Sequence, residues 1–419
     1  MKLKNIILIL FFGANIHLFS QTISSVKFEG LTHTKPSYLK QIIKCKKGVK
    51  YDSLIVANDV QTLKNLNLFF NVESKTHFNE MDSNVTVIFI IKEAKYLYPL
   101  ISVSGFKNVF KLQAGVNHIN WKGENKTIGF LYQYYNRHSF NFYQKTPRHK
   151  NGKTGHALSL SKYSTIEPLY FSQNKSFFNF DNYNVTAKGL YWINSKINFE
   201  LGGALMYENY LQIDTVDVGL SKMKFNFFKY QILSSFNFNK VNFLFERLNG
   251  LKYHFYTELI ETHHYPMASF FKLISNITYY KTVGRKGNFA LHQTIGVATN
   301  NNSPFSPFVI DGFINIRGVG NRIERGTAEH IINLEYRHTL LNKKYFTLQA
   351  ILFSDYGAIR DAGQSINELF DFKYDYLYSG IGIRLHSKFF YKSIFRLDFG
   401  VNLQHTTQNG FSFGVGQFF

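Results

Sequence analysis

From residue 97 to the end of the chain, apolar and polar residues alternate, and this pattern constrains the fold more than any other feature. In residues 395–403 the odd positions hold Phe, Leu, Phe, Val and Leu, and the even positions hold Arg, Asp, Gly and Asn. A period of two is typical of a β-strand with one apolar and one polar face. The sequence therefore predicts a β-dominated protein.

Soluble β-sandwiches and transmembrane β-barrels both show such alternation. The apolar faces here are rich in Phe, Leu, Ile and Tyr, and the chain holds 44 Phe and 27 Tyr. Lipid-facing strands and their aromatic girdles require this composition. The polar faces carry Arg, Asp, Glu and Asn, which the dry core of a sandwich would not accept unpaired. Both observations favour a barrel in a membrane over a soluble sandwich.

The rest of the composition excludes several classes of protein. Past residue 20 no run approaches the ~18 apolar residues that a spanning helix needs, which excludes a helical-bundle membrane protein. The single cysteine, Cys45, excludes a disulfide framework and a Cys-rich zinc site. No HExxH, GxSxG or Walker pattern is present. We therefore predict no enzymatic activity, no cofactor and no metal site.

The first twenty residues have the pattern of a secretory signal peptide. Lys2 and Lys4 precede an apolar run from Ile6 to Phe12, and the small residue Ser20 ends the segment. The mature protein is therefore expected outside the cytoplasm.

The formal net charge is +21, and two basic patches lie at residues 44–50 and 145–153. Such patches can bind nucleic acid. In an exported protein they fit anionic lipid, lipopolysaccharide or a client polypeptide better, so no nucleic-acid partner is predicted.

Residues 22–94 have a different pattern, which predicts the order β-α-α-β-β. The segments VKFEGLTHT, KKGVKYD, DVQTLKNLNLFFNV and VTVIFIIKEA, in this order and at this spacing, resemble a POTRA domain. POTRA domains are the periplasmic modules of outer-membrane protein assembly factors and their relatives. An unrelated small α+β domain is the alternative.

The end of the chain resembles the terminal aromatic signal of outer-membrane barrels. The segment FSFGVGQFF contributes Phe411 and Phe413 and ends on Phe419. Barrels of the assembly-factor superfamily have sixteen strands, and residues 97–419 provide about 20 residues for each strand with its connector, against the ~9–11 that a membrane strand needs. Ten strands are expected between residues 97 and 299, without individual bounds. Later strands are predicted at 329–340, 344–355, 375–386, 393–404 and 410–419.

The connector at about 300–328 contains FINIRGVGNRIERG, which resembles the sixth extracellular loop of that superfamily. The resemblance implies a loop that folds back into the barrel lumen, with Arg317 of the motif Ile316-Arg317-Gly318 contacting acids on the two following strands. The matching acids are Glu335 and Asp355. Their phase in the alternation places both on the inward face, and charge rather than apolar packing is expected to hold the loop.

Two further positions belong to this prediction. Gly357 follows Asp355 in the segment FSDYG and is grouped with the loop motif, and Val319 stands where the superfamily usually has Phe or Tyr. A solvated basic loop near two unrelated acids is the alternative.

These resemblances imply an outer-membrane barrel of the BamA/TamA-like bacterial surface antigen type, with one POTRA-like domain in the periplasm. Its expected function is to insert or translocate polypeptides, which it would capture by strand pairing at the POTRA-like sheet and at the seam of the barrel. Expected partners are unfolded outer-membrane or secreted polypeptides, outer-membrane lipid and lipopolysaccharide, and periplasmic accessory lipoproteins. A two-partner-type secretion transporter with one dedicated client and a passive porin or receptor barrel are the alternatives.

Overall fold

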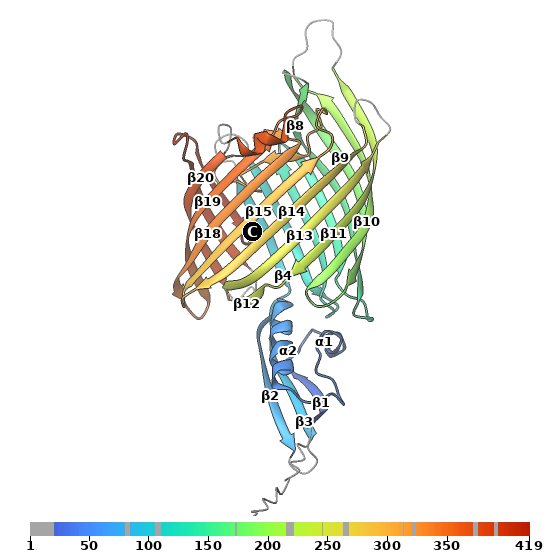
Figure 1. The fold of residues 1–419 in the computed structure, drawn as a ribbon, viewed down its shortest axis with the longest axis vertical. Helices are drawn as coiled ribbons and strands as arrows, with labels where there is room; N and C mark the ends of the chain where they lie inside the picture. The colour runs from blue at the N-terminus through green and yellow to red at the C-terminus, as the bar shows by residue number, and fades with distance from the viewer. Residues whose placement is uncertain are drawn as a thin grey trace, which may run out of the picture.

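The computed structural model describes residues 21–79, 84–104, 110–171, 174–214, 222–244, 246–262, 268–312, 314–320, 324–371, 376–388 and 393–419. The predicted signal peptide at residues 1–20 lies outside these ranges. The described chain forms a small N-terminal domain and a large barrel (Figure 1).

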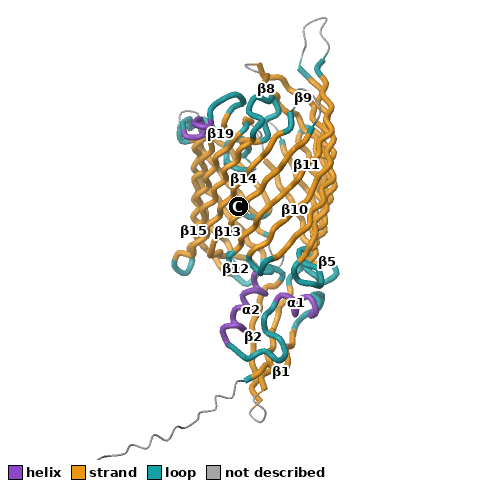
Figure 2. Tube along the Cα trace, turned by 45° about the vertical axis from the view of Figure 1, so that its right-hand side comes forward, coloured by secondary structure: helices purple, strands orange, loops and turns teal. Residues whose placement is uncertain are grey.

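The N-terminal domain has the predicted β-α-α-β-β order. Its elements are β1 (Thr22–Glu29), α1 (Pro36–Ile42), α2 (Ser53–Asn65), β2 (Phe69–Asn79) and β3 (Asn84–Glu93). The sheet has the order β1-β3-β2, with β1 parallel and β2 antiparallel to the central β3. Both helices lie beside this sheet (Figure 2).

Local sequence explains these elements. Pro36 occupies the first turn of α1, where its missing N–H costs nothing. Asp52 caps α2 by accepting the N–H of Leu54. On β3 every second residue from Val85 to Ile91 is at most 3% exposed, and these side chains form the domain's core with the two helices. The alternation on β3 therefore buries one face, as a sheet covered by helices requires.

The barrel is closed by sixteen antiparallel strands, as predicted. The strands are β4 (Leu97–Ser104), β5 (Lys111–Trp121), β6 (Lys126–Tyr135), β7 (Arg137–Thr146), β8 (Thr154–Phe171), β9 (Asn174–Trp192), β10 (Ile197–Gln212), β11 (Lys224–Asn239), β13 (Arg247–Glu261), β14 (Phe270–Val283), β15 (Gly287–Ala298), β18 (Ala328–Asn342), β19 (Phe346–Arg360), β20 (Tyr376–Ser387), β21 (Ile394–Asn402) and β22 (Asn409–Val415). The short β12 (Asn242–Leu244) pairs with the start of β13.

The outer face of the barrel is apolar. Leu201, Leu352 and Ile381 are 61–65% exposed, and many other large apolar side chains share this face. Soluble monomers rarely expose contiguous apolar patches of more than a few hundred Å². Lipid is the environment that such a surface fits.

No helix in the described ranges is long and apolar enough to cross a membrane.

The distribution of strands differs from the predicted one. Eleven barrel strands, not ten, precede residue 299, and β22 ends at Val415 rather than at residue 419. Strand length varies from 7 residues in β22 to 19 in β9, so the number of strands cannot be derived from an average length. All five strands predicted after residue 328 are present, with ends shifted by up to five residues.

Candidate functional site

The segment between β15 and β18, residues 299–327, is called the lumen loop, and its described residues (299–312, 314–320 and 324–327) fold into the barrel. It contains a small hairpin of β16 (Phe308–Ile310) and β17 (Glu324–Gly326). Ile316 and Arg317 are fully buried, and Val319 is 6% exposed. These buried residues show that the loop is packed inside the barrel.

Arg317 reaches both acids that the sequence analysis assigned to it. Its Nε and Nη2 donate to the two carboxylate oxygens of Asp355, each at 2.8 Å, and its Nη1 donates to Glu335 at 2.5 Å. The backbone N–H of Arg317 also donates to Asp355, at 2.9 Å. The planar guanidinium suits such paired acceptors, and an ammonium could not make the same set of bonds. We call Arg317, Glu335 and Asp355 the arginine lock.

Further charged residues on β18, β20 and β21 surround the lock. Arg337 donates to Glu335 at 2.6 Å, and Arg384 lies 3.5 Å from the same carboxylate and 2.6 Å from Asp398. All of these side chains are fully buried. The sequence-based prediction did not include Arg337, Arg384 and Asp398 in the lock. The available signal was their position on the polar phase of their strands, which Glu335 and Asp355 share.

Aromatic rings cover the guanidinium of Arg317. Its Cζ lies 3.8 Å from the ring centroid of Phe353 and 4.5 Å from that of Phe418. Both distances fit cation–π contacts, which strengthen where water is excluded.

Two glycines of the predicted motif are explained by close approach. Gly318 has φ +92°, and a Cβ there would lie 2.7 Å from the carbonyl oxygen of Gly400. A Cβ on Gly357 would lie 2.9 Å from the side chain of Ile316. Ile316 and Val319 pack with Ile310, Ile331 and Tyr378. The expectation that charge rather than apolar packing holds the loop was therefore incomplete, because the loop also carries its own apolar side chains into the lumen.

A second set of contacts holds the other part of the lumen loop. The ring of Phe305 lies 5.0 Å from that of Tyr210 and 5.1 Å from that of Phe227, on β10 and β11. Arg325 pairs with Glu167 of β8 at 2.5 Å. The loop is therefore attached to opposite sides of the barrel wall, and sequence reasoning did not predict this second attachment.

The last four residues, 416–419, do not continue β22, and we call them the tail. Phe418 stacks on Arg317, and the ring of Phe419 lies 5.4 Å from that of His292 inside the barrel. Phe411 instead faces outward and is 56% exposed. The predicted aromatic signal is thus divided between the outer face and the lumen. The rings of the tail contact a cation and another ring inside the barrel.

Among the sixteen strands of the wall, the seam between the first and last strands has the fewest paired positions in the described residues. Strands β4 and β22 pair at three positions, Ser102 with Gly414, Val103 with Phe413 and Ser104 with Ser412. The neighbouring pairs are longer, with eight positions between β4 and β5 and seven between β21 and β22. Among the described residues, the seam therefore has fewer paired positions than either neighbouring pair of strands.

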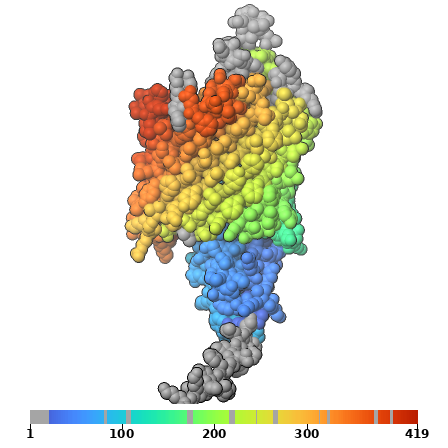
Figure 3. Space-filling view, in the orientation of Figure 1, coloured from blue at the N-terminus to red at the C-terminus, as the bar shows by residue number. Residues whose placement is uncertain are grey.

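The N-terminal domain contacts one end of the barrel directly (Figure 3). His33 hydrogen-bonds the carbonyl oxygen of Asn120 at 2.8 Å, and the N–H of Lys35 donates to Gly123 in the turn after β5 at 2.9 Å. On the other side of the domain, Asn65 of α2 donates to Asn242 of β12 at 3.2 Å. Two separate contacts therefore fix the domain beneath the barrel.

The carboxylate of Glu93 organises the first of these contacts. It accepts the backbone N–H groups of Thr32, His33 and Thr34 at 2.7–3.0 Å. Burial raises the pKa of this carboxyl group, but the hydrogen bonds from Thr32 and Thr34 outweigh burial and lower the pKa to about 2. Glu93 therefore stays ionised and holds the segment that touches the barrel.

Among the described residues, no three His, Cys, Asp or Glu side chains lie close enough together to hold a metal ion.

Comparison with known proteins supports the fold. Residues 21–94 match the sequence model of the POTRA family, described as the surface antigen variable number repeat. No curated protein matches the chain.

Solved structures match almost the whole chain. BamA from Haemophilus ducreyi lacking POTRA domains 1–3 matches at 14% identity, with 94% of this chain and 84% of that chain covered and a TM-score of 0.55. CdiB from Acinetobacter baumannii matches at 11% identity, with coverage of 94% and 73% and a TM-score of 0.59. CdiB from Escherichia coli matches at 13% identity, with coverage of 94% and 76% and a TM-score of 0.62. The predicted resemblance to the assembly-factor superfamily is confirmed at the level of fold: one POTRA domain precedes a sixteen-stranded barrel.

Proposed function

We propose that this protein resides in the outer membrane and inserts or translocates polypeptides there, with its POTRA domain in the periplasm. The short seam between β4 and β22 is the observation that carries the proposal. A barrel that opens at this seam would present two unpaired strand edges to a client that is itself adopting β-structure.

The POTRA sheet supplies a second edge for client capture. Its order β1-β3-β2 leaves one side of β2 without a neighbouring strand in the described domain. The exposed residues of β2 include Glu73, Lys75 and His77, so this edge is polar and accessible. An extended polypeptide can add to such an edge through backbone hydrogen bonds before it reaches the barrel.

The lumen loop argues against a passive porin. The arginine lock holds the loop to β18 and β19, and the contacts of Phe305 and Arg325 hold it to β8, β10 and β11. A porin needs a clear water-filled lumen, whereas here buried side chains cross it. The lock and the seam instead suit a wall that opens sideways.

The proposal is tested by removing the protein from cells and quantifying the outer-membrane proteome. Broad loss of barrel proteins would identify the protein as a general assembly factor. Loss of one protein would identify it as a dedicated transporter of the secretion type. An unchanged outer-membrane and secreted proteome would contradict the proposal.

A disulfide across the seam makes the test specific. Val103 and Phe413 face each other across the seam, so the variant V103C/F413C can be closed by oxidation. Phe399 and Phe411 face each other between β21 and β22, and F399C/F411C is the matched control. We expect the seam pair to abolish complementation until it is reduced, and the control pair to complement in both states.

A further inference from the structure

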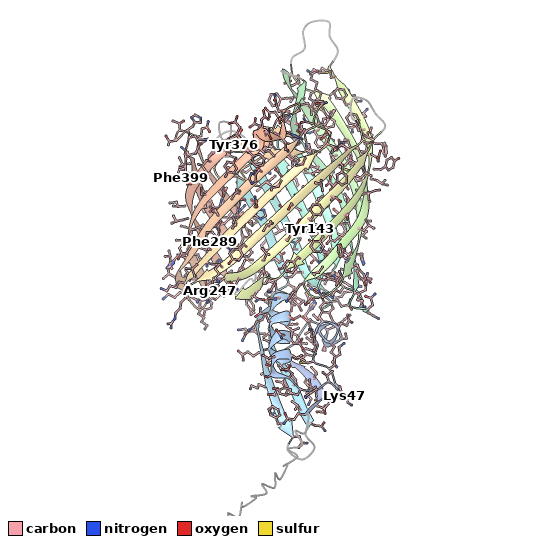
Figure 4. The ribbon with its side chains drawn as sticks, in the orientation of Figure 1. Lys47, Tyr143, Arg247, Phe289, Tyr376 and Phe399 are labelled. Atoms are coloured by element: carbon pink, nitrogen blue, oxygen red, sulfur yellow. The ribbon has the colours of Figure 1, made fainter. Side chains whose placement is uncertain are left out.

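The two ends of the barrel carry opposite charge. The seven turns at the POTRA end, residues 122–125, 147–153, 193–196, 240–246, 284–286, 343–345 and 388–393, contain twelve Lys and Arg residues and two Glu residues. The connectors at the other end contain six Lys and Arg residues and eight Asp and Glu residues. We call the turns at the POTRA end the basic rim; Arg247, labelled in Figure 4, follows one of them at the start of β13.

Many cations of the basic rim face solvent without an acidic partner. In the described parts of the chain, nine exposed side chains of the rim lie beyond salt-bridge distance of any carboxylate. These are Lys122, Lys150, Lys153, Lys196, Lys240, Arg285, Lys286, Lys343 and Lys344. By contrast Glu124, in the turn after β5, is shared between Lys35 and Lys126. The rim therefore presents uncompensated positive charge.

Aromatic side chains lie at the same level as these cations. The chain has two tryptophans, and both end strands at the basic rim: Trp121 ends β5 and Trp192 ends β9. The guanidinium of Arg148 stacks on Trp192 at 4.0 Å, and Lys344 lies over the ring of Tyr345 at 5.3 Å. Rings at strand ends with cations next to them are typical of the boundary between a membrane and water.

We propose that the basic rim binds the anionic head groups of phospholipids in the leaflet on the POTRA side. The cations occur in every turn from β5–β6 to β20–β21, so they surround the barrel. A lipid leaflet also surrounds the barrel, whereas a folded partner protein would contact one sector of it. The cations lie in the turns beyond the strands that carry the apolar outer face, which places them at head-group height. This inference goes beyond polypeptide handling and rests only on the membrane location within the proposed function.

The position of the tryptophans makes the proposal directly measurable. The mature chain is reconstituted into bilayers of phosphatidylcholine and phosphatidylglycerol in which only one of the two lipids is brominated. Bromine quenches tryptophan fluorescence at short range, so quenching reports which lipid lies against Trp121, which is 43% exposed. A single Lys or Arg next to an anionic membrane surface prefers that surface to a neutral one by roughly fivefold. We therefore expect about a fivefold preference for phosphatidylglycerol over phosphatidylcholine at low salt.

Two variants that each lose three positive charges distinguish lipid binding at the basic rim from a general effect of net charge. The rim variant carries Lys122→Gln, Lys150→Gln and Lys196→Gln. The control variant carries Lys162→Gln, Lys222→Gln and Lys224→Gln, on the side of the barrel wall away from the rim. We expect the preference to fall towards one in the rim variant and at ~0.5 M salt, and to persist in the control variant.

The possible outcomes are distinct. Equal quenching by both lipids in the unaltered protein would overturn the rim proposal and leave the polypeptide-handling function untouched. Absence of quenching by either lipid would overturn the membrane location and the rim proposal together. Equal quenching combined with tight binding of polyglutamate to the protein in phosphatidylcholine would overturn the proposal in favour of an acidic polypeptide.

Discussion

The ring of Phe418 lies against the guanidinium of Arg317, with 4.5 Å between the ring centroid and Cζ. One side chain of the lumen loop therefore contacts the tail that follows the last strand of the barrel. Phe418 also lies 4.9 Å from Cζ of Arg396 on β21. The arginine lock is thus connected through this aromatic ring to the tail that follows the seam strand β22, so a substitution in one should alter the conformation of the other.

Arg317→Ala should release the lumen loop. The substitution leaves the buried carboxylates of Glu335 and Asp355 without their shared cation. Breaking a buried pair from one side costs about 3–5 kcal/mol, and we expect the lower end because Arg337 and Arg384 remain beside Glu335. Protease access to residues 299–327 on intact cells should rise and activity should fall, with Arg317→Lys rescuing only in part.

The acids provide the matched test of the lock. Glu335→Gln combined with Asp355→Asn should expose the same loop, since both changes remove the acceptors of Arg317. Added to Arg317→Ala, this pair should not worsen the defect, because residues that act as one unit are not additive. Fully additive defects would show that the three side chains do not act together.

Phe418→Ala should let the tail extend β22 along β4. In the present register the next pair beyond Ser102 and Gly414 would be Ile101 and Val415, which are not paired here. A cysteine pair at Ile101 and Val415 should therefore cross-link faster in the Phe418→Ala background than without it. The V103C/F413C pair serves as control, since its cross-linking should be similar in both backgrounds. Equal rates for the Ile101–Val415 pair would mean that Phe418 does not hold the tail.

The isolated POTRA domain should fold on its own. Residues 21–94 contain both helices, all three strands and most of the domain's core. We expect a soluble fragment with a mixed α/β circular dichroism spectrum and one cooperative unfolding transition. A disordered spectrum would contradict the independent folding of this domain.

The stability of that fragment should depend on pH through Glu93. Its pKa is about 2 in the folded domain against an ordinary value of 4.5. The stabilisation is therefore fully present above pH 4.5 and is lost as the pH falls towards 2. Because the carboxylate is half-buried, solvent screening limits the effect to about 1–2 kcal/mol. Urea unfolding at pH 7 and pH 3 should show part of this loss in the unaltered fragment and a much smaller change in Glu93→Gln.

The mature protein should behave as an integral membrane protein. Its exposed apolar outer face predicts extraction by detergent but not by high salt or carbonate. Folded barrels often migrate anomalously on gels unless heated, so heating should change its mobility. Recovery in the soluble fraction after a carbonate wash would be incompatible with the barrel in a membrane.

The sequence by itself determined the features that depend on local geometry. A period of two follows from the pleat of a single strand, so the alternation was enough to predict the sheet and the inward phase of Glu335 and Asp355. Helix caps and apolar spacing likewise act within a few residues, and the β-α-α-β-β order of residues 22–94 could be read from them.

Only the tertiary structure decided which inward side chains meet. The alternation along each strand indicates that Arg337, Arg384 and Phe353 face the lumen. Their contacts with the lock depend on strand register and on closure of the barrel. The same holds for Phe305 between β10 and β11, for Phe418 on Arg317, and for the gathering of cations at one end. These contacts join segments far apart in the chain, and pairing between strands, which no local pattern specifies, brings them together.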